Sequence, residues 1–166
     1  AGWPVLANRA DTLLAETLAA ANQNAGTAVS PQRIEGWRQL LRLLREYLRD
    51  GGRLYGGSAG AVVAGADIGI AVVADPNDVG LSDTGALDLL NGMDVLPHYT
   101  ARDREKARAH TALTGRPVLC LPEASGVILG GGRFRNAGPE PIELVDRRGN
   151  VRALRAGDEY ITVFQA

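Results

Sequence analysis

Residues 55–65 read YGGSAGAVVAG, with a single serine among small and apolar residues. Gly56, Ser58 and Gly60 fit the pattern G-x-S-x-G, and RLYGG (53–57) favours a short strand before a helix. In a nucleophile elbow the serine stands on a sharp strand-to-helix turn, where bulky neighbouring side chains would collide. The stretch therefore predicts a strand–turn–helix unit with an exposed hydroxyl. The alternative is a glycine-rich loop that cradles phosphate or merely packs closely.

Patterns on either side extend this alternation of helices and strands. Ser30 followed by Pro31 marks the start of an amphipathic helix over 31–50, and Gly51 marks its end. The other expected elements are strands over 3–8, 68–74, 93–99 and 116–123, helices over 11–21 and 102–113, a helical turn over 86–92, and C-terminal hairpins with turns at 148–150 and 156–158. They predict one α/β domain over residues 1–166, with a mostly parallel sheet and an antiparallel C-terminal region.

Composition narrows the possible functions. The 166 residues carry a formal net charge of −1, which gives no electrostatic reason to expect binding to nucleic acid or to an anionic membrane. With one cysteine and two histidines, neither a disulfide framework nor a multi-histidine metal site is expected, and Cys120 is interpreted as a buried apolar residue. Neither a signal peptide nor an apolar run of about 18 residues is seen, so the expected location is a reducing cytoplasm.

A catalytic serine needs a general base, and the sequence offers two histidines. His98 follows MDVLP at the end of an expected strand, where it can face the same edge of the sheet as Ser58. His110 lies within the charged helix over 102–113 and is expected to be exposed. His98 is therefore the favoured base, and the alternative is that it has a structural role only.

The base in turn needs an acid that orients its ring. Glu123 directly follows the apolar run PVLCLP, at a position where strand ends expose functional groups. Asp75 and Asp78 compete for this role, although DPND is also ordinary turn sequence. The order serine, histidine, glutamate differs from the order in α/β-hydrolases, so a standard hydrolase fold is not expected.

Three segments carry a resemblance to a known family. GGSAGA (56–61), LPHY (96–99) and LPEAS (121–125) resemble, in order and spacing, the motifs of the peptidase E family of serine peptidases. That family contains aspartyl dipeptidase and cyanophycinase. The resemblance covers roughly residues 36–166. It implies a Rossmann-like three-layer sandwich that needs no cofactor or metal, here with a sheet shortened on its N-terminal side.

The resemblance also implies roles for individual residues. Carried over by position, Ser58, His98 and Glu123 form a Ser-His-Glu catalytic triad. The N–H of Ala59 corresponds to one donor of the oxyanion hole. Gly26, in the segment QNAGT, lies at the spacing of the family's glycine-rich loop and corresponds to the second donor.

A substrate contact follows from the same resemblance. In aspartyl dipeptidase an arginine in the helix after the histidine binds the carboxylate of the substrate. Arg104 matches that position best here, with Arg102 as its neighbour. Its alternative role is that of a solvated charge on a polar helix.

These observations predict a serine peptidase that hydrolyses short peptides, with dipeptidase selectivity for an acidic N-terminal residue as the finer expectation. The main alternative is a non-catalytic binding or regulatory protein on the same fold. It is favoured by the small number of residues before the serine, compared with the family, and by the single glycine of QNAGT. Amidase chemistry is a third alternative, but the related glutaminases carry cysteine at the elbow. Because a shortened sheet would expose an edge, a homo-oligomer is expected.

Overall fold

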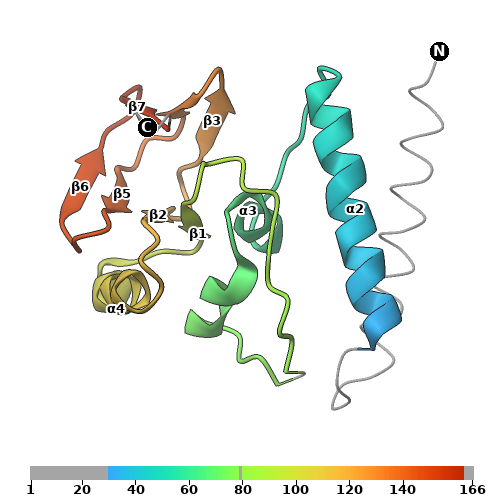
Figure 1. The fold of residues 1–166 in the computed structure, drawn as a ribbon. Coiled ribbons are helices and arrows are strands. Elements are labelled where there is room, and N and C mark those ends of the chain that lie inside the picture. Colours follow the sequence, from blue (N-terminus) through green and yellow to red (C-terminus); the bar gives the residue numbers. More distant parts are fainter. Residues whose placement is uncertain (1–29, 79, 163–166) are drawn as a thin grey trace. The chain divides into compact units, whose positions relative to one another are not determined.

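The computed structural model describes residues 30–78 and 80–162, which form two compact units (Figure 1). Within the described chain, the first unit takes residues 30–55 and 76–84, and the second takes 56–75 and 85–162. The strand expected over 3–8 and the helix expected over 11–21 lie outside the described residues. The single domain over residues 1–166 stays a prediction.

The first unit is built on one long helix, α2 (Pro31–Arg49). Its N-terminus is capped by Ser30, whose Oγ accepts a hydrogen bond from the Arg33 N–H at 3.4 Å. Arg38, on its exposed side, forms an ion pair of 2.7 Å with Asp83. The helix expected over 31–50 is therefore confirmed. The strand expected over 53–57 is wrong, because these residues have no regular secondary structure.

The second unit contains a mixed sheet of four strands in the order β1-β2-β5-β6. The strands are β1 (Asp94–Leu96), β2 (Val118–Cys120), β5 (Ile142–Val145) and β6 (Val151–Leu154). β1 and β2 are parallel, whereas β2–β5 and β5–β6 are antiparallel. The mostly parallel sheet that the sequence predicts is thus not found in the described residues, where one strand pair is parallel.

A smaller antiparallel sheet of order β3-β4-β7 belongs to the same unit. It consists of β3 (Val127–Gly130), β4 (Arg133–Asn136) and β7 (Glu159–Ile161). The turn around Gly149 joins β5 to β6 as a hairpin, as predicted. The turn around Gly157, also predicted, instead carries the chain from β6 in one sheet to β7 in the other.

The helices of the second unit are α3 (Ala59–Ala64), η1 (Ile68–Val73), η2 (Ala101–Asp103) and α4 (Arg104–Thr114). The helix η1 replaces the strand expected over 68–74. Asp67 accepts a hydrogen bond from the Gly69 N–H at 2.7 Å and so caps a short 3-10 helix. The helical turn expected over 86–92 is also wrong, because the N–H groups of Ala86, Leu87 and Leu89 bond carbonyls at the end of α3 and just beyond it.

Both faces of the four-stranded sheet are covered within the second unit. Leu119 and Leu144 pack on one face against Phe134 of the smaller sheet. Val118 and Cys120 pack on the other face, in a cluster that includes side chains of α3, η1 and α4. The unit is thus of α/β type, and Cys120 is fully buried, as expected from its apolar segment.

Candidate active site

The serine turn has the backbone that an elbow requires. Ser58 has φ +52° and ψ −119°, in a region that residues with a side chain rarely occupy, and it directly precedes α3. A Cβ on Gly56 would lie 2.5 Å from the carbonyl oxygen of Gly60, so glycine is required there. A Cβ on Gly60 would meet nothing within 4 Å. The tight packing therefore depends on the first glycine of the motif and not on the last.

His98 and Glu123 lie beside this turn. The Nε2 atom of His98 is 2.8 Å from the Oγ of Ser58, and its Nδ1 atom contacts Oε1 of Glu123. Both side chains are largely accessible to water, at 55% exposed for His98 and 77% for Glu123. The structure therefore brings together the three residues that the sequence proposes as a triad, in the order hydroxyl, imidazole, carboxylate.

The parallel pair of β1 and β2 explains why His98 and Glu123 meet. Leu96 is opposite Cys120 at the last residues of the two strands, and both strands run toward the same edge. The backbone pairing continues beyond them, because the Leu121 N–H donates to the Leu96 carbonyl at 2.9 Å. His98 and Glu123 follow within three residues of their strands, so the same edge presents both side chains.

This arrangement suits proton transfer from a hydroxyl. A neutral imidazole that donates Nδ1–H to a carboxylate leaves the Nε2 lone pair free to accept a proton. The Nε2 atom faces Ser58, and a carboxylate on the opposite side would stabilise the imidazolium formed. The described geometry is therefore compatible with general-base activation of Ser58.

The oxyanion donors are placed only in part. Ala59 is the first residue of α3, where a backbone N–H has no acceptor within the helix. This N–H directly follows Ser58, as in the elbow of other serine hydrolases. Gly26, expected to provide the second donor, lies outside the described residues. Both roles stay predictions.

Arg104 has an internal partner. Its Nε and Nη2 donate to the two carboxylate oxygens of Glu143 at 3.0 and 2.6 Å, and the Tyr99 hydroxyl donates to the same carboxylate at 2.6 Å. Hydrogen bonds from Arg104 outweigh partial burial and hold the pKa of Glu143 below its usual range. Partial burial, together with the carboxylate, raises the pKa of Tyr99. The role of Arg104 as a substrate contact stays a prediction.

Sequence reasoning did not single out Tyr99 or Glu143. The one signal for Tyr99 was its place directly after the histidine, in the segment LPHY. Glu143 interrupts an apolar strand sequence, IELV, with a single charge, and this is the signal that marks a buried carboxylate with a partner.

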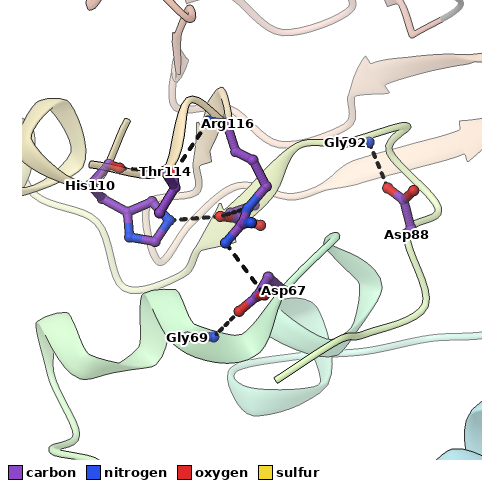
Figure 2. A network of polar contacts seen from close by, with 8 residues as sticks. Asp67, Gly69, Asp88, Gly92, His110, Thr114 and Arg116 are labelled. Carbon is purple, nitrogen blue, oxygen red and sulfur yellow. Dashed lines mark hydrogen bonds and ion pairs between the residues drawn. The ribbon is translucent and has the colours of Figure 1, made fainter. Parts of the chain in front are cut away.

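The second histidine proves not to be exposed. The His110 side chain is 9% exposed, and its Nε2 lies 2.6 Å from Oδ2 of the fully buried Asp94. Arg116 donates to the same oxygen at 2.8 Å and pairs with Asp67 at 3.4 Å (Figure 2). Since Asp94 begins β1 whereas His98 follows its end, His110 belongs to a polar network at the opposite edge of the sheet. The expectation that His110 lies on an exposed helix face is wrong.

The described residues hold neither a candidate metal centre nor a candidate membrane span. Within residues 30–78 and 80–162, no group of three or more histidine, cysteine or acidic side chains is placed to hold a metal ion. Across the same ranges, no helix is both long and apolar enough to span a bilayer.

Comparison with known proteins identifies the family. The family model of peptidase family S51 matches residues 33–137, a segment that contains Ser58, His98 and Glu123. A comparison with curated proteins finds no match. The matched segment covers well over half of the chain and confirms the peptidase E resemblance. The chain belongs to peptidase family S51.

Proposed function

We propose that the protein is a serine peptidase that hydrolyses short peptides through Ser58, His98 and Glu123. The observation that carries the proposal is the pair of contacts on one imidazole, with Nε2 at 2.8 Å from Ser58 Oγ and Nδ1 against Glu123. Membership in peptidase family S51 supports the same chemistry. A surface histidine has no structural need for both partners at once, so the arrangement favours catalysis.

The proposed reaction has two half-reactions. Ser58 Oγ attacks the peptide carbonyl while its proton passes to His98 Nε2, and the tetrahedral oxyanion is held by the N–H groups of Ala59 and Gly26. The imidazolium, steadied by Glu123, gives the proton to the leaving amine, and an acyl-enzyme forms. Water then attacks the ester, His98 again accepts and returns a proton, and the free acid leaves with Ser58 regenerated.

The finer proposal is a dipeptidase that acts after an acidic N-terminal residue, with Arg104 as the substrate contact. Arg104 is bidentate to Glu143 in the structure, so a substrate carboxylate would have to replace Glu143 or share the guanidinium with it. An Arg104→Lys variant tests this role. If Arg104 binds the substrate carboxylate, the variant should have a higher KM for acidic dipeptides, and a smaller change in KM for neutral ones. The Rossmann-like three-layer sandwich belongs to the same proposal and is supported by the α/β second unit.

The decisive experiment uses a fluorophosphonate, which reacts with activated serines. Wild type is expected to gain the mass of one phosphonyl group, and Ser58→Ala is expected to gain none. A panel of dipeptides and of simple amides, including glutamine, then identifies the bond cleaved. Failure of the wild type both to react and to cleave would favour the alternative of a non-catalytic binding protein, and cleavage of amides alone would favour amidase chemistry.

Two further proposals concern the protein in the cell. The described four-stranded sheet has β1 and β6 at its edges, and open edges support a homo-oligomer, which light scattering after size-exclusion chromatography tests directly. A reducing cytoplasm is proposed as the location, on the basis of the single cysteine.

A further inference from the structure

A partly buried carboxylate lies under the N-terminus of α4 and is not used by the proposed mechanism. Glu143 sits in the middle of β5, opposite Cys120 of β2, and its side chain is 17% exposed. It accepts hydrogen bonds from the Tyr99 hydroxyl and from Nε and Nη2 of Arg104. Three donors on one carboxylate, two of them from a cation, make Glu143 the centre of a fixed polar cluster.

This cluster connects directly to the proposed general base. Tyr99 follows His98 in the chain, is 7% exposed, and is held at both ends. Its N–H donates to the Leu121 carbonyl at 3.0 Å, and its hydroxyl donates to Glu143 at 2.6 Å. Movement of the Tyr99 backbone would therefore break contacts with two different strand segments.

His98 needs such support because its backbone is strained. Its φ of +55° is in the left-handed region, which residues with a side chain adopt uncommonly and at a cost that the surrounding structure must offset. The imidazole itself is 55% exposed, so packing against the ring contributes little to its position. The residues that flank His98 must therefore fix its direction, and Tyr99 is the buried one on its C-terminal side.

We propose that Glu143 is a positioning residue which, through the hydroxyl of Tyr99, holds the His98 imidazole between Ser58 and Glu123. The inference rests on the proposed function for its catalytic meaning. Arg104 completes the cluster by fixing the Glu143 carboxylate in the orientation that Tyr99 binds. Neither Tyr99 nor Glu143 touches the reacting atoms.

The test compares Tyr99→Phe, Glu143→Gln and the double variant with wild type. Phenylalanine keeps the buried ring and removes only the hydroxyl. Each single variant is expected to lower the rate of phosphonylation of Ser58, and kcat for a cleaved neutral dipeptide, by about tenfold, with KM for that neutral dipeptide nearly unchanged. Because both residues act through one hydrogen bond, the double variant is expected to lose much less than the product of the two single losses.

Tyr160→Phe is the matched control, since it removes a hydroxyl from a half-buried tyrosine of the smaller sheet. It is expected to leave the rate unchanged. A rate for Tyr99→Phe equal to that of wild type would overturn the proposal, and so would fully multiplicative losses in the double variant. Circular dichroism checks that each variant folds. If Tyr99→Phe does not fold, the rate of Glu143→Gln is compared with that of wild type in its place.

A second readout separates this inference from the proposed function. The Nδ1–H proton of His98 is followed by NMR and assigned by its absence in His98→Gln. It is expected to be sharp in wild type and in Tyr160→Phe, but broadened or shifted in Tyr99→Phe. An inactive wild type with this NMR result would refute the peptidase proposal and support the positioning role, whereas an unchanged resonance in Tyr99→Phe would refute the positioning role itself.

Discussion

Replacing Glu123 with glutamine removes the negative charge that faces His98 while keeping the size of the side chain. Two effects are expected on the proposed general base. The imidazolium that forms as Ser58 reacts loses a stabilising charge, and the amide can donate to Nδ1 and so favour the tautomer whose Nε2 cannot accept a proton. Both effects slow the attack of Ser58 without removing any part of the fold.

The exposure of His98 and Glu123 sets the size of the charge effect on the reaction rate. Unit charges about 4 Å apart attract by about 1 kcal/mol in water and by about 4 kcal/mol at an effective dielectric constant of ~20. Since His98 and Glu123 are 55% and 77% exposed, we expect a value between these limits. About 2 kcal/mol corresponds to a ~30-fold slower reaction. This loss from the charge alone is far smaller than the roughly 10⁴-fold effect of replacing a buried triad aspartate by asparagine, which also imposes the wrong imidazole tautomer.

The measurement is the second-order rate constant with which a fluorophosphonate modifies Ser58 at neutral pH, followed by intact mass. Glu140→Gln is the matched control, because Glu140 is an exposed glutamate outside the proposed site. Its rate should equal that of wild type. An unchanged rate for Glu123→Gln would mean that the carboxylate does not support His98. A loss near 10⁴-fold would show that the wrong tautomer, or shielding of the pair from water, outweighs the screened charge, and would refute the magnitude derived from its exposure.

Three further predictions concern stability and reactivity. Burial raises the pKa of the Cys120 thiol to about 12, so Ellman's reagent should react with the single cysteine only after unfolding, and rapid reaction of the native protein would contradict its burial. Because Arg104 lowers the pKa of Glu143, their pair should stabilise the fold above the ordinary glutamate pKa of about 4.3 and less as pH falls through the folded-state value. The difference in free energy of unfolding between wild type and Glu143→Gln, from urea titrations, should therefore shrink in acid; a constant difference would exclude the pair as its source. Gly56→Ala should destabilise the protein by about 1–3 kcal/mol because its Cβ would meet the Gly60 carbonyl, whereas Gly60→Ala, with open space, should not, and equal stability of both variants would contradict the packing.

Elements with strong local signals could be predicted from the sequence. The helix α2 begins where Ser30 and Pro31 indicate, and its N-cap hydrogen bond is present. The apolar run around Cys120 forms the strand β2, which lies between β1 and β5 in the four-stranded sheet. These signals depend on residues close together in the chain, so no knowledge of the tertiary structure was needed.

The segment over 68–74 shows where local reasoning fails. Its β-branched and apolar residues favour a strand, yet it forms a 3-10 helix capped by Asp67 and buried at Ile70. Asp67 also pairs with Arg116, which follows α4 and lies 49 positions away in the chain. A preference set by such a distant partner is invisible in the segment itself.

The direction of the strands was equally hard to predict. A parallel strand after β2 would need a crossover connection, usually a helix. The chain from β2 to β5 instead contains the hairpin of β3 and β4, and β5 returns antiparallel to β2. Short strands of similar composition do not reveal which neighbour they pair with, so the predicted parallel arrangement overestimated the extent of the parallel region.

For the candidate site, motif spacing was more informative than any single residue. Ser58, His98 and Glu123 were proposed from three separate segments, and the structure places their side chains in contact. The partner of Arg104 was missed because Glu143 is 39 positions away in the chain, and the single charge in its apolar strand does not reveal which residue it pairs with. The catalytic roles of Ser58, His98 and Glu123 stay predictions, which the experiments above test.

The register of the two parallel strands also limits how this chain can vary in length. With Leu96 opposite Cys120, the imidazole stands two residues beyond one strand and the carboxylate three beyond the other. Adding one residue to either short spacer would move His98 or Glu123 away from the position that its strand end now gives it, because each spacer is only two or three residues long. The length of these two spacers is therefore tied to the site, and an insertion of a single residue in either one is expected to separate the acid from the base.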